Sequence, residues 1–226
     1  MNINTLNLKK KIQYEDTLQL KPLTRGITGV IPGGISVIDF AIVAQTDQIS
    51  AKEILNVLVA NKIGSFEGEN VNFNPEDKLK AALFAISQGA PIDDVSIYLN
   101  WKDFEGLVAE ILESKNFDII KNLVLTKPRM EIDVIGINHG VAVLIDCKHW
   151  KRMSSSTLRE IVKKQVARAK HYVGKTQVAI AVPAIVTLYQ EEISFIDNVP
   201  IIPILQFSSF LDEFYGNLDD LKTIET

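Results

Sequence analysis

Two apolar, β-rich segments joined by a short polar turn constrain the fold of this chain more than any other feature. The segments cover 131–137 and 141–147, and Asn138-His139-Gly140 separates them. A two-residue turn at His139-Gly140 would make a β-hairpin in which paired residue numbers add to 279. Asp133 would then face Asp146, with Cβ atoms about 4.5–5.5 Å apart. Since two carboxylates repel at that distance, this register predicts a positive partner beside them.

The elements expected around this hairpin indicate an α/β fold built on one sheet. From Trp101 the pattern is helix, strand, strand, helix, strand, strand, helix. A capping-box pattern of Thr157 with Glu160 predicts the start of the middle helix. We expect strands over 122–126, 131–137, 141–147, 177–182 and 200–205, and helices from Trp101, over 157–172 and over 208–215. Residues 99–226 are therefore predicted to form a mixed sheet flanked by helices.

Residues 1–98 show a different pattern and are predicted to form a small helical domain. Turn residues such as Pro22 and Gly26 indicate an extended opening. Helices are expected over 36–44, 50–61 and 76–88, with a hairpin over 64–73 and a capping box of Ser50 with Glu53. The order helix, helix, hairpin, helix is similar to that of a winged-helix module. The alternative is a helical domain that packs on the rest of the chain or on a partner.

The composition is that of a folded protein without a membrane span. Hydrophobic residues make up 46% and charged residues 23%. The longest apolar run, Val178–Tyr189, is broken by Pro183 and falls short of the roughly 20 residues that cross a bilayer. The start of the chain lacks a signal-peptide pattern. The single cysteine, Cys147, excludes an intramolecular disulfide framework and a multi-cysteine zinc site. We therefore expect a cytoplasmic protein.

Basic residues are concentrated in one part of an acidic chain. The net charge is −4, yet residues 147–175 contain nine Lys or Arg against one acid, Glu160, so this stretch carries +8 and the remainder −12. Such a stripe is typical of contact with phosphate, and the alternative is a solvated helix face. The DNA-binding candidates are Lys151, Arg152, Arg159, Lys163, Lys164 and Arg168.

The residues near the hairpin are those that phosphodiester hydrolysis needs. Lys148 lies two residues beyond Asp146 and on the same face of its strand, because side chains alternate along a strand. Carboxylates hold a divalent cation that polarises a phosphoryl oxygen, and a nearby ammonium can position the attacking water or stabilise the transition state.

This arrangement resembles the PD-(D/E)xK nuclease superfamily, in particular Mrr-like restriction endonucleases and archaeal Holliday-junction resolvases. The resemblance covers about residues 101–207 and rests on Phe104-Glu105, Glu131-Ile132-Asp133-Val134-Ile135-Gly136 and Leu144-Ile145-Asp146-Cys147-Lys148. It implies a restriction-endonuclease-like fold, with Asp133 and Asp146 binding Mg²⁺ or Mn²⁺, Lys148 catalytic and Glu105 supporting the metal from a helix. Ile132 departs from the motif, which has proline before the first aspartate.

Several of these residues have a structural alternative. Gln165 falls on the inward face of its helix; the family often carries a catalytic glutamine there, and the alternative is a hydrogen-bonded core amide. Glu105 could simply be solvated on its helix. Cys147 alternates to the other face of the sheet and is interpreted as a core cysteine. His149 and His171 are expected to touch phosphate, if anything, rather than metal.

The sequence therefore predicts a two-domain, metal-dependent DNA endonuclease, which the resemblance implies can act as a homodimer. The alternatives are a catalytically silent DNA-binding protein with a nuclease fold and a structural partner in a DNA repair or restriction complex. With Lys148 as the only cation expected beside Glu105, Asp133 and Asp146, the metal-free site should be strained by repulsion. Asp146→Asn would then raise the melting temperature in EDTA.

Overall fold

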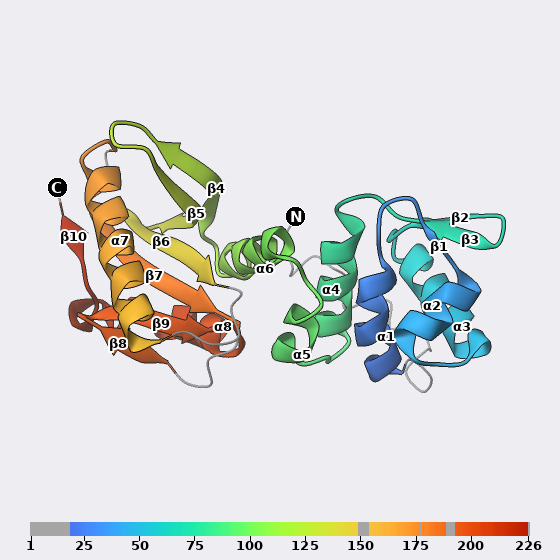
Figure 1. The fold of residues 1–226 in the computed structure, drawn as a ribbon. Coiled ribbons are helices and arrows are strands. Elements are labelled where there is room, and N and C mark those ends of the chain that lie inside the picture. The colour runs from blue at the N-terminus through green and yellow to red at the C-terminus, as the bar shows by residue number, and fades with distance from the viewer. Residues whose placement is uncertain (1–18, 149–153, 177, 189–192, 226) are drawn as a thin grey trace. The chain divides into compact units, whose positions relative to one another are not determined.

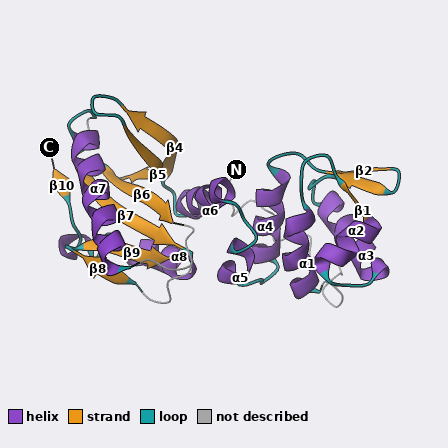
Figure 2. Cartoon of the chain, in the orientation of Figure 1, coloured by secondary structure: helices purple, strands orange, loops and turns teal. Residues whose placement is uncertain are grey.

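The computed structural model describes residues 19–148, 154–176, 178–188 and 193–225. The chain divides into two compact units, Met1–Asp103 and Phe104–Thr226. The first is mainly helical and the second is built on a large sheet (Figures 1 and 2). The predicted class, a mixed α/β sheet flanked by helices and preceded by a small helical region, is confirmed. Among the described residues no helix combines the length and the apolar character needed to cross a membrane.

The N-terminal unit combines helices with a three-stranded antiparallel sheet of order β1-β3-β2. The predicted order helix, helix, hairpin, helix is present, and a helix and a short strand precede it. The elements are α1 (Leu20–Gly26), the 3-10 helix η2 (Ile27–Gly29), β1 (Ile35–Ser36), α2 (Val37–Ala44), α3 (Gln48–Ala60), β2 (Ser65–Glu67), β3 (Asn70–Asn72), α4 (Asp77–Ser87) and α5 (Ile92–Ser96).

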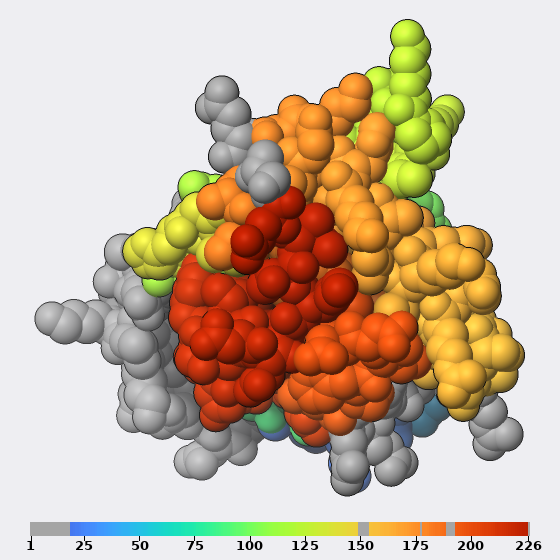
Figure 3. Space-filling view, turned by 90° about the vertical axis from the view of Figure 1, so that its left-hand side faces the viewer, coloured from blue at the N-terminus to red at the C-terminus, as the bar shows by residue number. Residues whose placement is uncertain are grey.

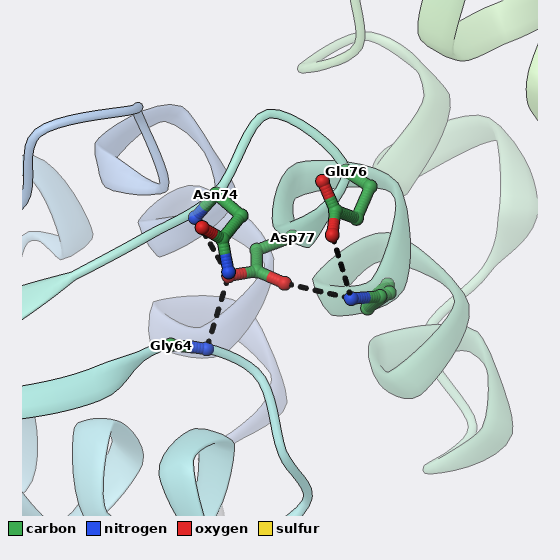
Figure 4. A network of polar contacts seen from close by, with 5 residues as sticks. Gly64, Asn74, Glu76 and Asp77 are labelled. Atoms are coloured by element: carbon green, nitrogen blue, oxygen red, sulfur yellow. Dashed lines mark hydrogen bonds and ion pairs between the residues drawn. The ribbon is translucent and has the colours of Figure 1, made fainter.

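The buried carboxylate of Asp77 ties the β2–β3 hairpin to α4 (Figure 4). Its Oδ2 accepts hydrogen bonds from the backbone N–H of Gly64, at 3.2 Å, and of Asn74, at 2.8 Å. Its Oδ1 lies 3.0 Å from Lys80 Nζ. Because Gly64 precedes β2 and Asn74 follows β3, one side chain satisfies backbone donors at both ends of the hairpin.

Some sequence-based boundaries are wrong for identifiable reasons. Residues 20–26 form a helix where an extended segment was expected, since Pro22 lies in the first turn, where a missing N–H costs nothing. The expected capping boxes are not the caps. Asp47 accepts from the N–H groups of Ile49 and Ser50 at the start of α3, and Ser154 accepts from Thr157 N at the start of α7. Both helices therefore begin two residues earlier than predicted.

The C-terminal unit contains a seven-stranded mixed sheet of order β4-β5-β6-β7-β9-β8, with β10 paired to the start of β7. β6, β7 and β9 are parallel, whereas β4, β5 and β8 are antiparallel to their neighbours. The elements are α6 (Trp101–Ser114), which begins at the end of the first unit, β4 (Asp118–Leu125), β5 (Met130–Asn138), β6 (Val141–Lys148), α7 (Ser155–Val173), β7 (Ile180–Thr187), β8 (Ser194–Ile196), β9 (Val199–Pro203), α8 (Ile204–Glu213), η3 (Leu218–Asp220) and β10 (Ile224–Glu225).

Helices cover both faces of this sheet. On one face Ala169, Tyr172 and Val173 of α7 pack on Leu144 and its neighbours. On the other, α6 comes so close to β5 that a Cβ on Gly136 would lie 2.9 Å from Leu112. α8 lies on this second face too, since Phe214 just beyond it contacts Phe117, which also borders Gly136. The sheet is therefore the middle of three layers, and α7 is the helix that faces the even-numbered residues of β6.

Candidate active site

The β5–β6 hairpin has the predicted register over most of its length. Pairs run from Asn138 with Val141 to Val134 with Ile145, and each adds to 279. His139 and Gly140 both have positive φ, 47° and 78°, as a tight two-residue hairpin turn requires. The ladder stops at Val134, so the expected pairing of Asp133 with Asp146 does not form. Instead, Asp133 Oδ2 accepts a hydrogen bond of 2.7 Å from the backbone N–H of Cys147.

Asp146 is the centre of the site and is almost fully buried, with 2% of its surface exposed. Its Oδ1 accepts a hydrogen bond of 2.8 Å from Arg168 Nη1. Its Oδ2 lies 2.7 Å from Lys148 Nζ. This second contact is an ion pair without hydrogen-bond alignment, because Oδ2 accepts no hydrogen bond. One buried carboxylate therefore lies between two cations.

Gln165 and Arg168 extend this network from α7. Gln165 is completely buried, and its Nε2 donates to the backbone oxygen of Leu144 at 2.7 Å. Its Oε1 accepts from Arg168 Nη1 at 3.0 Å. The Gln165 amide thus donates a hydrogen bond to a backbone carbonyl of β6 and orients the Arg168 guanidinium at the same time. Arg168 was predicted from the sequence to contact DNA, and its contact with Asp146 was not predicted. The sequence does contain a signal for this contact: Arg168 follows Gln165 by three residues, and this spacing puts the two side chains on one face of the helix.

Asp133 is half-buried beside Asp146. Burial raises the pKa of the Asp133 carboxyl, and the charge of Asp146 raises it further, while the hydrogen bond from Cys147 N opposes the change. Because Asp133 accepts from the N–H of Cys147, which directly follows Asp146, the two carboxylates are neighbours although they are not paired in the ladder. Two such groups next to each other favour a bound cation.

Glu105 and Cys147 border the same region from the other side of the sheet. Glu105 is buried in α6, with 8% of its surface exposed. Burial, followed by the charges of Asp133, Glu105 and Asp146, raises the pKa of the Cys147 thiol well above its ordinary value. The thiol therefore stays protonated and is a poor nucleophile. All three predicted carboxylates lie within electrostatic reach of Cys147.

The donor chemistry fits a hard divalent cation. Asp133 and Asp146 offer carboxylate oxygens of the kind that Mg²⁺ binds, and the buried Asp146 Oδ2 accepts no hydrogen bond. In the described part of the chain, however, no three His, Cys, Asp or Glu side chains are gathered closely enough to hold a metal ion. The three-carboxylate metal site that includes Glu105 stays a prediction.

The predicted DNA contacts divide into three groups. Arg159, Lys163 and Lys164 are exposed on α7. Arg168 is bound within the site, with 22% of its side chain exposed. Lys151 and Arg152 lie outside the described residues, as does His149. DNA binding by the basic stripe stays a prediction.

Comparisons with known proteins leave the activity open. No protein-family model and no curated protein matches the chain. Similar solved structures include protein VC1899 from Vibrio cholerae, with 16% identity and a TM-score of 0.43 over 91% of this chain and 53% of that one. Another is Can2 from Sulfobacillus thermosulfidooxidans in complex with cyclic tetra-adenylate, with 15% identity and a TM-score of 0.38 over 88% of this chain and 50% of that one. The chain spans about half of each, and at these values the likeness carries no argument about activity.

Proposed function

We propose that the protein is a metal-dependent DNA endonuclease whose active site contains Asp133, Asp146 and Lys148. The observation that carries the proposal is the buried Asp146, which lies 2.7 Å from the Lys148 ammonium. Asp133 lies beside it where the β5–β6 ladder ends, since it accepts a hydrogen bond from the N–H of Cys147. Two adjacent carboxylates repel each other and would not stabilise a site that serves packing alone. Hydrolysis of a phosphodiester, in contrast, needs both oxygen ligands for a cation and a nearby ammonium.

Each residue has a defined task in this proposal. Asp133 and Asp146 would hold Mg²⁺ or Mn²⁺, which supplies Lewis acidity and a more acidic water when bound. Lys148 positions the attacking water or stabilises negative charge on the phosphorane-like transition state. Gln165 keeps β6 and Arg168 in place. One water adds to phosphorus and one P–O ester bond breaks, which gives a phosphomonoester and an alcohol.

The test is cleavage of labelled linear, branched and methylated DNA with Mg²⁺, Mn²⁺ or EDTA, by wild type and by Asp133→Asn. We expect cleavage by wild type only with metal, and loss of cleavage in the variant. The asparagine oxygen can still accept from Cys147 N, so the fold should persist, and melting curves check this. Equal metal-dependent cleavage by both proteins, purified in parallel, would indicate a contaminating nuclease or another site.

The exposed lysines of α7 give a second expectation. Replacing Lys163 and Lys164 by Ala should weaken binding to all DNA sequences alike, because phosphate contacts carry no sequence information. The slope of log affinity against log salt should fall by about one for each lost contact. Fluorescence anisotropy over a series of salt concentrations in EDTA measures it. An unaltered slope would mean that these lysines face solvent or a protein partner.

One observation favours a second candidate, a DNA-binding protein with a silent site. Both oxygens of Asp146 already lie against protein cations, Arg168 and Lys148. A carboxylate satisfied in this way can be structural. The two candidates differ in their response to metal, because only an active site that binds Mg²⁺ or Mn²⁺ is stabilised against unfolding by it.

A further inference from the structure

The basic stripe is extended by the turn between β4 and β5, at the point where this turn meets the end of α7. The surface formed there consists of Lys127 and Arg129 from the turn and Lys170, His171 and Lys175 from the helix and the residues after it, and is called the tip cluster below. His171 Nε2 lies 3.1 Å from the backbone oxygen of Thr126, which joins the two segments. Figure 3 shows the yellow-green turn beside the orange end of α7. The turn residues are far from the basic stripe in sequence, so the stripe alone did not indicate this surface.

The turn is held firmly against the helix. Leu125 pairs with Met130 at the last rung of the β4–β5 ladder, directly below the turn. Leu125 also belongs to an apolar cluster with Tyr172 and Val173 of α7, against which Met130 packs. Lys127 and Arg129 are therefore presented on a supported turn, so little further ordering of the backbone is needed when they bind a ligand.

The four Lys and Arg side chains of the tip cluster are exposed, and in the part of the chain that the structure describes they pair with no acid. Lys127, Arg129, Lys170 and Lys175 are exposed and His171 is half-buried. None of the five forms an ion pair with an acidic side chain among the described residues. The acid nearest in sequence to the turn is Glu131, which is exposed on β5. Glu225 is also exposed, on β10, which packs beside α7. Four Lys or Arg side chains against these two acids leave an excess of positive charge, which attracts a polyanion.

We propose that the tip cluster binds the phosphate backbone of DNA close to the bond that is cleaved. The position rests on the proposed function, because the site at Asp133 and Asp146 defines that bond. Lys170 and His171 follow Arg168, which contacts Asp146, by two and three positions on α7. Arg129 lies in the turn that directly precedes β5, the strand that carries Asp133.

The shape of the charged array favours a nucleic acid over an acidic protein. Exposed lysines continue along α7 from Lys163 through Lys170 to Lys175, just beyond its end. At about 1.5 Å per residue this row is roughly 18 Å long. A row of this kind suits an extended polyanion with regularly spaced charges, whereas a folded acidic protein offers a compact patch.

Two double variants test the proposal: Lys127→Gln with Arg129→Gln, and Lys170→Gln with Lys175→Gln. Glutamine removes the charge but keeps a long polar side chain, and at Lys127, where φ is 57°, it is no more strained than lysine. Binding to a short labelled DNA duplex is measured by anisotropy in EDTA at several salt concentrations. The matched control is Lys21→Gln with Lys222→Gln, which removes two exposed charges elsewhere.

We expect each tip variant to bind DNA more weakly than the control and to lose about one to two units of salt slope, one for each phosphate contact. Binding is measured in EDTA, where metal-dependent cleavage does not occur. The tip-cluster proposal and the nuclease proposal can therefore fail independently. If wild type cleaves DNA but the tip variants bind like the control at every salt concentration, the tip cluster is not a DNA contact. If they show the expected loss while wild type cleaves nothing, the tip cluster stands and the nuclease proposal fails. Failure of wild type to bind DNA overturns both, and an acidic protein would then be the partner to seek.

Discussion

Lys148→Ala is expected to slow metal-dependent DNA cleavage by at least about 10²-fold while DNA affinity stays within a few-fold of wild type. Its ammonium lies 2.7 Å from Asp146 Oδ2, beside the carboxylates proposed to bind metal. There it can act on the attacking water or on the transition state, whereas most phosphate contacts are expected from α7 and the tip cluster. Loss of one transition-state-stabilising group of this kind lowers the rate by about 10²–10³-fold. Single-turnover cleavage with saturating protein measures the rate of the chemical step directly.

The control for this variant is Lys222→Ala, which removes an exposed lysine far along the chain. Melting curves must show that Lys148→Ala is folded, since Asp146 then loses one of the two cations that contact it among the described residues and keeps Arg168. A folded Lys148→Ala protein that cleaves DNA at the wild-type rate would remove Lys148 from the proposed mechanism. Loss of binding together with cleavage would indicate that Lys148 holds the substrate rather than acting in the chemical step.

The parts of the structure that were predicted correctly depend on local periodicity. The hairpin register follows from alternation along two strands and from a two-residue turn at His139-Gly140. The inward direction of Gln165 follows from helical spacing, and its amide is indeed fully buried with hydrogen-bond partners. Its catalytic role stays a prediction. Both inferences need only residues that are close in sequence.

The features that sequence analysis missed depend on packing between elements or on a local break in a pattern. β4 begins at Asp118 rather than at Asn122, and Asn122, with a positive φ of 52°, is the position between Asp118 and Leu125 that leaves the pairing with β5. Asp133 leaves the ladder to bind the backbone of Cys147. The guanidinium of Arg168 reaches a carboxylate 22 positions away. A charged helical residue gives no indication in sequence of whether it faces solvent or another charge.

Arg168 changes the expected effect of the most informative substitution in the site. With Lys148 as the only nearby cation, Asp146→Asn was expected to stabilise the metal-free protein by relieving repulsion. The structure places two cations against Asp146, and both are largely buried, with 19% and 22% of their side chains exposed. Removing the central charge takes away the carboxylate that both cations contact in a partly desolvated site, and breaking a buried ion pair is costly.

We therefore expect Asp146→Asn to lower the free energy of unfolding in EDTA by about 2–4 kcal/mol, somewhat below the cost of breaking a fully buried pair because the two cations keep some access to water. The melting temperature should fall by roughly 10 °C. The matched control is Asp212→Asn, because Asp212 pairs with Lys115 at the surface, where an ion pair contributes about 1 kcal/mol or less. Adding Arg168→Ala to Asp146→Asn should cost less than the sum of the two single changes, because they remove the same contact.

Adding metal to the same melting experiment distinguishes a nuclease from a silent DNA-binding protein. Mg²⁺ or Mn²⁺ should raise the melting temperature of wild type and leave Asp146→Asn almost unchanged, because a ligand stabilises only the state that binds it. If metal shifts neither protein while Asp146→Asn is still destabilised in EDTA, Asp146 is a structural residue and the silent DNA-binding protein is the better account. If Asp146→Asn melts above wild type in EDTA, repulsion among Glu105, Asp133 and Asp146 outweighs the contacts with Arg168 and Lys148. The metal-free site would then be strained, as the sequence alone indicated.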